Sequence, residues 1–187
     1  NNIAAKLGIR AEHTAILNKW NIAPRASLAY KFKDNSQASF AYGIFYQNPE
    51  RKYLPAANSG LDFARASHYI LQYQKVSNNR VFRTEIFYKE YNNLFKTSTG
   101  PTGRDAAANN NGFGYARGFE IFWRDKKSIK NLDYWISYSF LDTKRDFLNY
   151  PTEFQPAFAA THTASLVMKK FVLPWKTGFN LSYSFAT

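Results

Sequence analysis

The sequence predicts an all-β protein, an antiparallel up-and-down transmembrane β-barrel to which the 187 residues contribute about nine strands. Three observations support this prediction. Apolar and polar residues alternate with period two in about nine segments. Each segment is about ten residues long, which suits a tilted membrane strand of ~9–11 residues better than a soluble strand of ~5–6. Long and short connections alternate between the segments, as they do in up-and-down barrels.

The predicted strands share one arrangement, in which an apolar face of aliphatic and aromatic side chains lies opposite a polar face. In the last segment, for example, Phe179, Leu181, Tyr183 and Phe185 fall on one face. The segments with this arrangement are residues 3–10, 25–32, 39–46, 68–74, 82–89, 119–124, 134–140, 163–169 and 175–185. Because side chains of a barrel strand point alternately outwards and inwards, we expect the apolar face to meet lipid.

Aromatic residues make up 18% of the chain, with 13 Tyr, 17 Phe and 4 Trp. These residues favour strands, and Tyr and Trp also favour membrane–water boundaries. Some aromatic side chains break the alternation by lying on the polar face, namely Phe45, Phe87, Phe122 and Trp135. We expect them to pack against something inside the barrel.

The connections between the predicted strands differ in length. Short connections lie around residues 34–35, 77–79, 127–131 and 172–174. Long connections span residues 13–24, 48–67, 92–113 and 146–161, and they hold most of the prolines and an Asn/Gly/Ala-rich stretch. Strict alternation of the two kinds predicts tight periplasmic turns and long extracellular loops.

Composition excludes several classes of protein. There is no cysteine for disulfide or thiolate chemistry. No apolar run approaches the ~20 residues of a spanning helix. The first residues do not form a signal peptide, so we expect the sequence to begin at a mature end or inside a longer protein.

The formal net charge of +12 is explained either by solvated turns and a polar lumen or by a surface that binds nucleic acid or an anionic membrane. Many of the basic residues lie at or beside the short turns: Lys31, Lys33, Lys75, Arg80, Arg124, Lys126, Lys127, Lys130, Lys169, Lys170 and Lys176. They are spread round one rim, and a nucleic-acid site needs them gathered on one face, so we expect no nucleic-acid partner. Contact with lipid headgroups or polar partners and simple solvation of the turns both remain open.

The histidine and glutamate residues do not have the spacing that metal sites and catalytic sites require. His13, His68 and His162 are not at metal-ligand spacing. Glu85 and Glu90 lie on opposite strand faces and cannot act as an acid/base pair on one substrate atom. We therefore expect no catalytic residues, no metal and no cofactor.

Several strand segments follow one another along the chain: NIAPR (21–25) running into LAY (28–30), SFAYGIFYQNP (39–49), EIFYKEYNNL (85–94), GYARGFE (114–120), DYWISYS (133–139) and THTASL (161–166). In this order they resemble strands of TonB-dependent outer-membrane receptors of the Bacteroidetes type. Each piece is a common strand pattern, and it is their order and spacing that make the resemblance specific.

This resemblance implies a barrel of about 22 strands with a plug domain in its lumen. Residues 1–187 would then form a partial transmembrane barrel domain, with the plug and the other strands outside the sequence. An open set of strands would leave unpaired edges in lipid, which also favours missing sequence on both sides. A small complete barrel is the structural alternative.

The functional expectation follows from the same resemblance. The parent protein would lie in the bacterial outer membrane, bind a scarce nutrient outside the cell and import it with energy from the inner membrane. A siderophore, cobalamin or a glycan would be the ligand, and the partners would be outer-membrane lipid, the plug domain and an energy-coupling protein. A passive porin or a structural outer-membrane barrel is the alternative.

Strand direction and face together predict a ligand-binding ring at the extracellular mouth. The polar-face residues at the long-loop ends of the strands are Arg10, Arg25, Gln47, His68, Tyr91 and Arg145. Loop residues placed to close over a ligand are Trp20, Tyr53 and Tyr150. The arginines suit an anionic ligand through forked hydrogen bonds. The alternative is that these residues brace the plug or one another.

Overall fold

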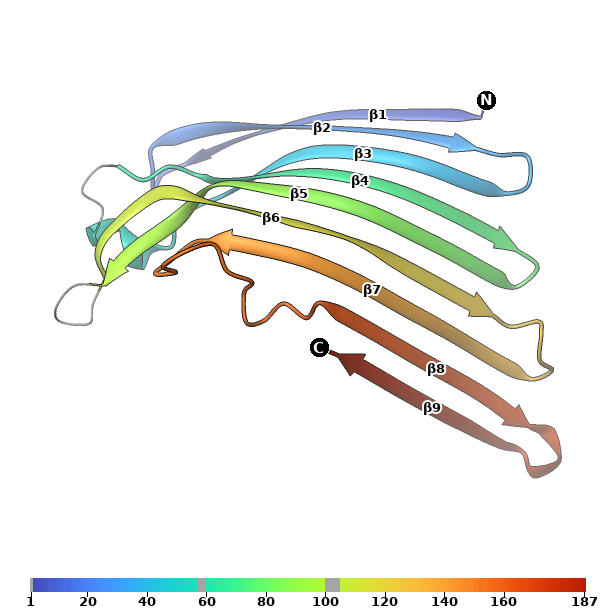
Figure 1. The fold of residues 1–187 in the computed structure, drawn as a ribbon. Helices are drawn as coiled ribbons and strands as arrows, with labels where there is room; N and C mark the ends of the chain where they lie inside the picture. The colour runs from blue at the N-terminus through green and yellow to red at the C-terminus, as the bar shows by residue number, and fades with distance from the viewer. Residues whose placement is uncertain (1, 57–59, 100–104) are drawn as a thin grey trace.

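The computed structural model of the chain describes residues 2–56, 60–99 and 105–187. Its strands form one antiparallel sheet in chain order, from β1 at one edge to β9 at the other (Figure 1). The elements are β1 (Ile3–Thr14), β2 (Lys19–Lys31), β3 (Ser36–Gln47), η1 (Arg51–Ala56), β4 (Ala64–Ser77), β5 (Arg80–Thr99), β6 (Asp105–Asp125), β7 (Leu132–Asp146), β8 (His162–Val172), η2 (Leu173–Trp175) and β9 (Thr177–Ala186). The predicted all-β, up-and-down antiparallel fold is confirmed. Among the described residues no helix has the length and apolarity to span a membrane.

Most strands are longer than the sequence predicts. β9 has 10 residues, but β5 has 20 and β6 has 21. Only ~9–11 residues are needed to cross a membrane, so the β5–β6 hairpin continues well beyond the span. In Figure 1 this hairpin curls away from the rest of the sheet at the end that carries the longer connections. We call this end the long-loop end and the opposite one the short-turn end.

The prediction of a long loop is wrong in two places, where the structure has paired strands. Residues 13–24 form a tight turn at residues 15–18, and strand pairing continues to Thr14 and Lys19. Residues 92–113 are mostly strand, interrupted by bulges near Tyr91 and Leu94, and residues 100–104 lie outside the described part of the chain. The polar composition of these stretches resembles loop chemistry, but paired strands outside a membrane tolerate polar side chains on both faces. The connections 48–63 and 147–161 are long, as predicted.

The turns at the short-turn end lie where the sequence places them. Asn35, Asn78, Asn79 and Asn131 adopt positive φ values of 60°, 44°, 65° and 60°. Asparagine tolerates this left-handed conformation better than most residues, so it allows the chain to reverse within a few residues.

The outward face of the sheet is apolar. One row across the strands joins Leu28, Phe40, Leu71, Ile86, Phe119 and Phe140 in register. Leu28, Leu71 and Ile86 remain 53%, 53% and 58% exposed. A contiguous exposed apolar surface of this kind is unstable in water and suits the hydrocarbon of a membrane. The predicted face assignment is therefore correct, and we call the two sides the apolar face and the polar face.

A small core holds the connections together at the long-loop end. Tyr53, Leu61 and Ala108 are buried against one another, at 5%, 3% and 4% exposure. Leu17 from the β1–β2 turn and Leu148 from the β7–β8 connection pack on this cluster. The cluster links residues far apart in sequence, so this end of the sheet has a packed cap.

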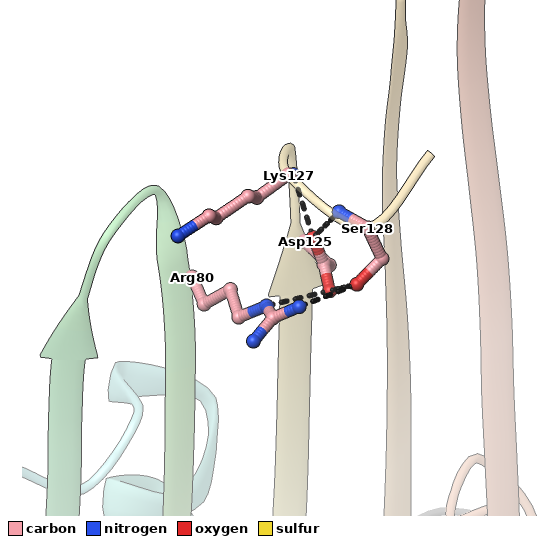
Figure 2. A network of polar contacts seen from close by, with 4 residues as sticks. All are labelled: Arg80, Asp125, Lys127 and Ser128. Carbon is pink, nitrogen blue, oxygen red and sulfur yellow. Dashed lines mark hydrogen bonds and ion pairs between the residues drawn. The ribbon is translucent and has the colours of Figure 1, made fainter. Parts of the chain in front are cut away.

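At the short-turn end, a polar network fixes the β6–β7 turn. The Asp125 side chain is only 2% exposed and accepts hydrogen bonds from Arg80 Nε at 2.9 Å and Ser128 Oγ at 2.6 Å. Its other oxygen accepts the backbone N–H groups of Lys127 at 2.7 Å and Ser128 at 2.9 Å, as Figure 2 shows. Because Arg80 begins β5, the network ties this turn to the neighbouring hairpin.

Candidate functional site

The first candidate site lies on the polar face around Gly43 of β3. Arg25 of β2 and His68 of β4 are its direct partners in the two neighbouring strands. A Cβ at Gly43 would lie 3.1 Å from Phe45 Cε2 and 3.4 Å from Arg25 Cγ. The missing side chain therefore leaves room for the Phe45 ring and the arginine to fold over the strand.

The same residues form an aromatic floor with cations around it. The Arg25 guanidinium lies 4.6 Å from the centre of the Phe45 ring, and the His68 ring lies 4.5 Å from it. Lys6 and Arg10 of β1 line the same cavity, whose volume is about 420 Å³. Arg10 also pairs with Glu12 of its own strand. Three cations and one aromatic face favour a planar or anionic group.

A second contact joins β5 to β7 across Gly114 of β6. Tyr91 and Arg145 are the strand partners of Gly114 on either side, and the guanidinium lies 4.3 Å from the centre of the Tyr91 ring. A Cβ at Gly114 would come within 2.5 Å of the Lys144 carbonyl oxygen, so only glycine fits.

The β7–β8 connection folds back over this contact. Arg145 exchanges two backbone hydrogen bonds with Phe154, at 2.8 Å and 3.0 Å. The centre of the Phe158 ring lies 5.9 Å from the guanidinium, and Arg145 Nε is buried without a hydrogen-bond partner among the described residues. An oxygen acceptor supplied from outside this chain would satisfy that group.

The structure divides the predicted ring into separate groups. Arg10, Arg25 and His68 share the first cavity, while Tyr91 and Arg145 form the second contact. Gln47 ends β3 opposite Ala64, beyond the first cavity. The predicted binding role of these residues stays a prediction.

The three predicted loop residues lie elsewhere. Trp20 is in β2 on the apolar side, 70% exposed and beside His13 of β1 at 5.2 Å. Tyr53 is buried in the cap, and Tyr150 packs on Phe147 at 4.8 Å within the β7–β8 connection. In this structure none of the three closes over the cavity around Gly43.

Each aromatic side chain that breaks the alternation on the polar face is covered by a cation. Besides Arg25 on Phe45, the pairs are Lys89 on Phe87 at 5.1 Å, Arg83 on Phe122 at 5.6 Å, and Arg124 and Lys169 on Trp135, both at 5.2 Å. The sequence showed the aromatic exceptions but not their partners, which come from residues on the same face of the same or the neighbouring strand.

A pair of carboxylates was also missed. Glu85 of β5 and Glu120 of β6 are direct strand partners on the polar face. Within the described residues, neither has an ion-pair partner, and Glu85 only accepts a hydrogen bond from Gln72 Nε2 at 3.4 Å. Like charges opposite one another destabilise a strand pair. Their common face and register could have been found by aligning the two strands by hairpin geometry.

An antiparallel sheet in chain order with one exposed apolar face is the arrangement of a transmembrane β-barrel wall, and comparison with known proteins agrees. No protein-family model and no curated protein matches the sequence. Among solved structures, the FrpB iron transporter from Neisseria meningitidis (F3-3 variant) aligns with 100% of this chain and 31% of its own length, at 11% identity and a TM-score of 0.79.

Two further structures match as well. The outer-membrane transporter YddB from Escherichia coli covers 99% of this chain with 31% of its own, at 15% identity and a TM-score of 0.76. The apoprotein form of FrpB, F5-1 variant, gives 12% identity and a TM-score of 0.76. At these identities the likeness concerns the fold, which is that of outer-membrane transporter barrels. The predicted location in the bacterial outer membrane agrees with it.

Proposed function

We propose that residues 1–187 are a partial barrel domain of an active transporter in the bacterial outer membrane. The parent protein binds a scarce nutrient outside the cell and imports it with energy coupled from the inner membrane. Its plug domain and remaining strands lie outside this sequence. The chain spans 31% of the length of the transporters it matches, which supports this division.

The observation that carries the proposal is the nature of the polar face. It presents aromatic rings, of which Phe45, Phe122 and Trp135 remain only half-buried, and the directly opposed carboxylates of Glu85 and Glu120. A water-filled channel gains nothing from aromatic rings on its wall, whereas a domain packed inside the barrel would bury them. A basic group of that domain would also neutralise the two carboxylates.

The alternative is a passive porin or a structural outer-membrane barrel. Both would share the apolar outer face, and a porin lumen is also lined with charged residues. The cation-covered aromatics of the polar face favour the plugged barrel over the porin.

Within this proposal, the first cavity and the Tyr91–Arg145 contact capture an anionic ligand at the mouth. A siderophore, cobalamin or a glycan fits the resemblance, and FrpB is described as an iron transporter, so an iron chelate is the first ligand to test. The competing role is that these cations brace the plug.

An uptake assay tests the proposal. A strain lacking the parent gene is compared with the complemented strain under iron starvation and with glycans as sole carbon source, with and without a protonophore. Energy-coupled import predicts growth that depends on the gene and uptake that stops when the protonophore is added. Gene-dependent uptake that continues after the membrane potential collapses would instead identify a passive porin.

A further inference from the structure

The carboxylates at the short-turn end are all occupied. Asp34 pairs with Lys75 Nζ at 2.7 Å, Asp125 with Arg80 Nε at 2.9 Å and Asp133 with Arg124 Nη2 at 2.6 Å. Lysines therefore remain there without an ion-pair partner in the described parts of the chain. They are Lys31, Lys33, Lys127, Lys130, Lys169, Lys170 and Lys176.

Three of these lysines, Lys130, Lys170 and Lys176, lie at the corner formed by the ends of β7, β8 and β9. The backbone N–H of Phe171 donates a hydrogen bond to the Asn131 carbonyl at 3.2 Å, which places the turn bearing Lys130 beside β8. Lys170 is in register with Leu132 of β7 and Phe179 of β9. Lys176 closes the β8–β9 turn in the left-handed conformation, with φ of 49°.

Large apolar side chains are exposed at the same corner. Leu173 is 60% exposed and Trp175 is 69% exposed, both within η2. The Trp175 ring lies 6.3 Å from the ring of Phe179, which belongs to the apolar face. The membrane-facing surface therefore continues without a break into the turn that carries the lysines.

We propose that this corner, defined by Lys130, Lys170, Lys176 and Trp175, binds the headgroup of an anionic phospholipid. The orientation rests on the proposed function, which places the short-turn end in the inner leaflet of the outer membrane. The acyl chains lie along Phe179 and Leu181, both exposed on the apolar face. Trp175 lies at the membrane–water interface. The lysine side chains extend to the phosphate, while their aliphatic parts stay in apolar surroundings.

Two alternatives to a lipid are plain solvation of the turns and binding of a soluble acidic protein. The charge and the apolar surface of the corner together favour the lipid. Turns that are merely solvated gain nothing by exposing Leu173 and Trp175 to water. A soluble acidic protein would meet the lysines from the aqueous side and would not cover Phe179. An anionic lipid satisfies both surfaces at once.

The experiment uses the purified full-length parent protein in nanodiscs. Binding to phosphatidylglycerol is measured by native mass spectrometry against nanodiscs of phosphatidylcholine alone. The test variant carries Lys130→Gln, Lys170→Gln and Lys176→Gln. The matched control carries the same charge change at the long-loop end, with Lys19→Gln, Lys52→Gln and Lys144→Gln. A third variant replaces the corner lysines with arginine and keeps the charge.

We expect the test variant to bind phosphatidylglycerol about tenfold to a hundredfold more weakly, with the control and the arginine variant near wild type. Folding of each variant is checked by heat-dependent electrophoretic mobility. Equal binding by the test variant and wild type, or an equal loss in the control, would overturn the lipid site. Lipid binding is measured without any nutrient, so a failure of the uptake proposal would leave this result intact.

Discussion

At the scale of single residues, glycine decides where side chains of the polar face can meet. Gly43 and Gly114 each lie between two predicted site residues in the neighbouring strands. A Cβ would crowd the Phe45 ring at Gly43 and would overlap the Lys144 carbonyl oxygen at Gly114. Gly118 does the same for Phe87, since its Cβ would lie 3.0 Å from Phe87 Cζ and overlap the Phe140 carbonyl oxygen. The face of each side chain and the order of the strands can be predicted from the sequence. Which side chains come close across neighbouring strands depends on the register of the strands.

We predict that Gly118→Ala destabilises the barrel by about 1–3 kcal/mol because the new methyl group has no space. Gly8→Ala is the matched control, since nothing lies within 4 Å of a Cβ at that position. It should change stability by less than about 0.5 kcal/mol. The midpoint of heat- or urea-induced unfolding of the refolded protein measures both. Equal midpoints for the two variants would show that β6 and β7 relax to accept the methyl group.

A second prediction concerns the arginines. Arg25→Ala and Arg145→Ala should each weaken binding of the imported ligand about tenfold or more, because each removes a forked, charged donor. Lys52→Ala in η1 serves as the control. Affinity is measured with whichever ligand restores growth in the uptake assay, at equal surface expression. Unchanged affinity would leave these arginines as braces for the plug.

At the scale of strands and turns, period two was sufficient to assign faces, because alternation is a direct consequence of strand geometry. Strand ends were less predictable. Residues 13–24 and 92–113 contain Asn, Gly and Pro, so they resemble loops, yet β1, β2, β5 and β6 continue through much of them. Outside the membrane, the amino-acid composition of a segment does not show whether it pairs with a neighbouring strand. The turn asparagines were predictable because positive φ restricts the choice of residue.

The β2–β3 turn gives a prediction about pH. The hydrogen bond from Lys75, followed by that from Ser36, lowers the pKa of Asp34 from 3.8 to about 2. A carboxyl with a lowered folded-state pKa stabilises the turn above its unfolded pKa, and this contribution is lost as the pH falls from about 4 to about 2. Carboxyl NMR titration of the protein in micelles should therefore show a midpoint near 2.

The matched variant Lys75→Met removes the largest cause of the shift, so the Asp34 midpoint should rise towards its ordinary value. Asp34 is half exposed, so the effect on overall stability should be small. A midpoint that stays low in Lys75→Met would assign the shift to Ser36 instead.

At the scale of the whole molecule, the two faces of the sheet satisfy different surroundings. The apolar face is uniform across the strands, whereas the polar face combines covered aromatics, a cationic cavity and two carboxylates that have no ion-pair partner among the described residues. A uniform face suits a solvent such as lipid, and a varied face suits a specific partner. The two carboxylates destabilise the sheet when they face only each other, and they stabilise the protein when a basic partner lies against them.

We therefore predict opposite effects of Glu85→Gln combined with Glu120→Gln in two contexts. In the barrel domain without a plug, the double variant removes repulsion between strand partners and should raise stability by about 0.2–1 kcal/mol. The proposed function places a basic group of the plug against these carboxylates in the full-length protein, and on that proposal the same change should lower stability and increase permeability to small solutes. Glu90→Gln, on the other face of β5, is the matched control and should do neither. Thermal unfolding and antibiotic sensitivity of intact cells measure the two effects. If the double variant stabilises the full-length protein as well, no basic group meets Glu85 and Glu120, and the polar face lines open water as a porin wall does.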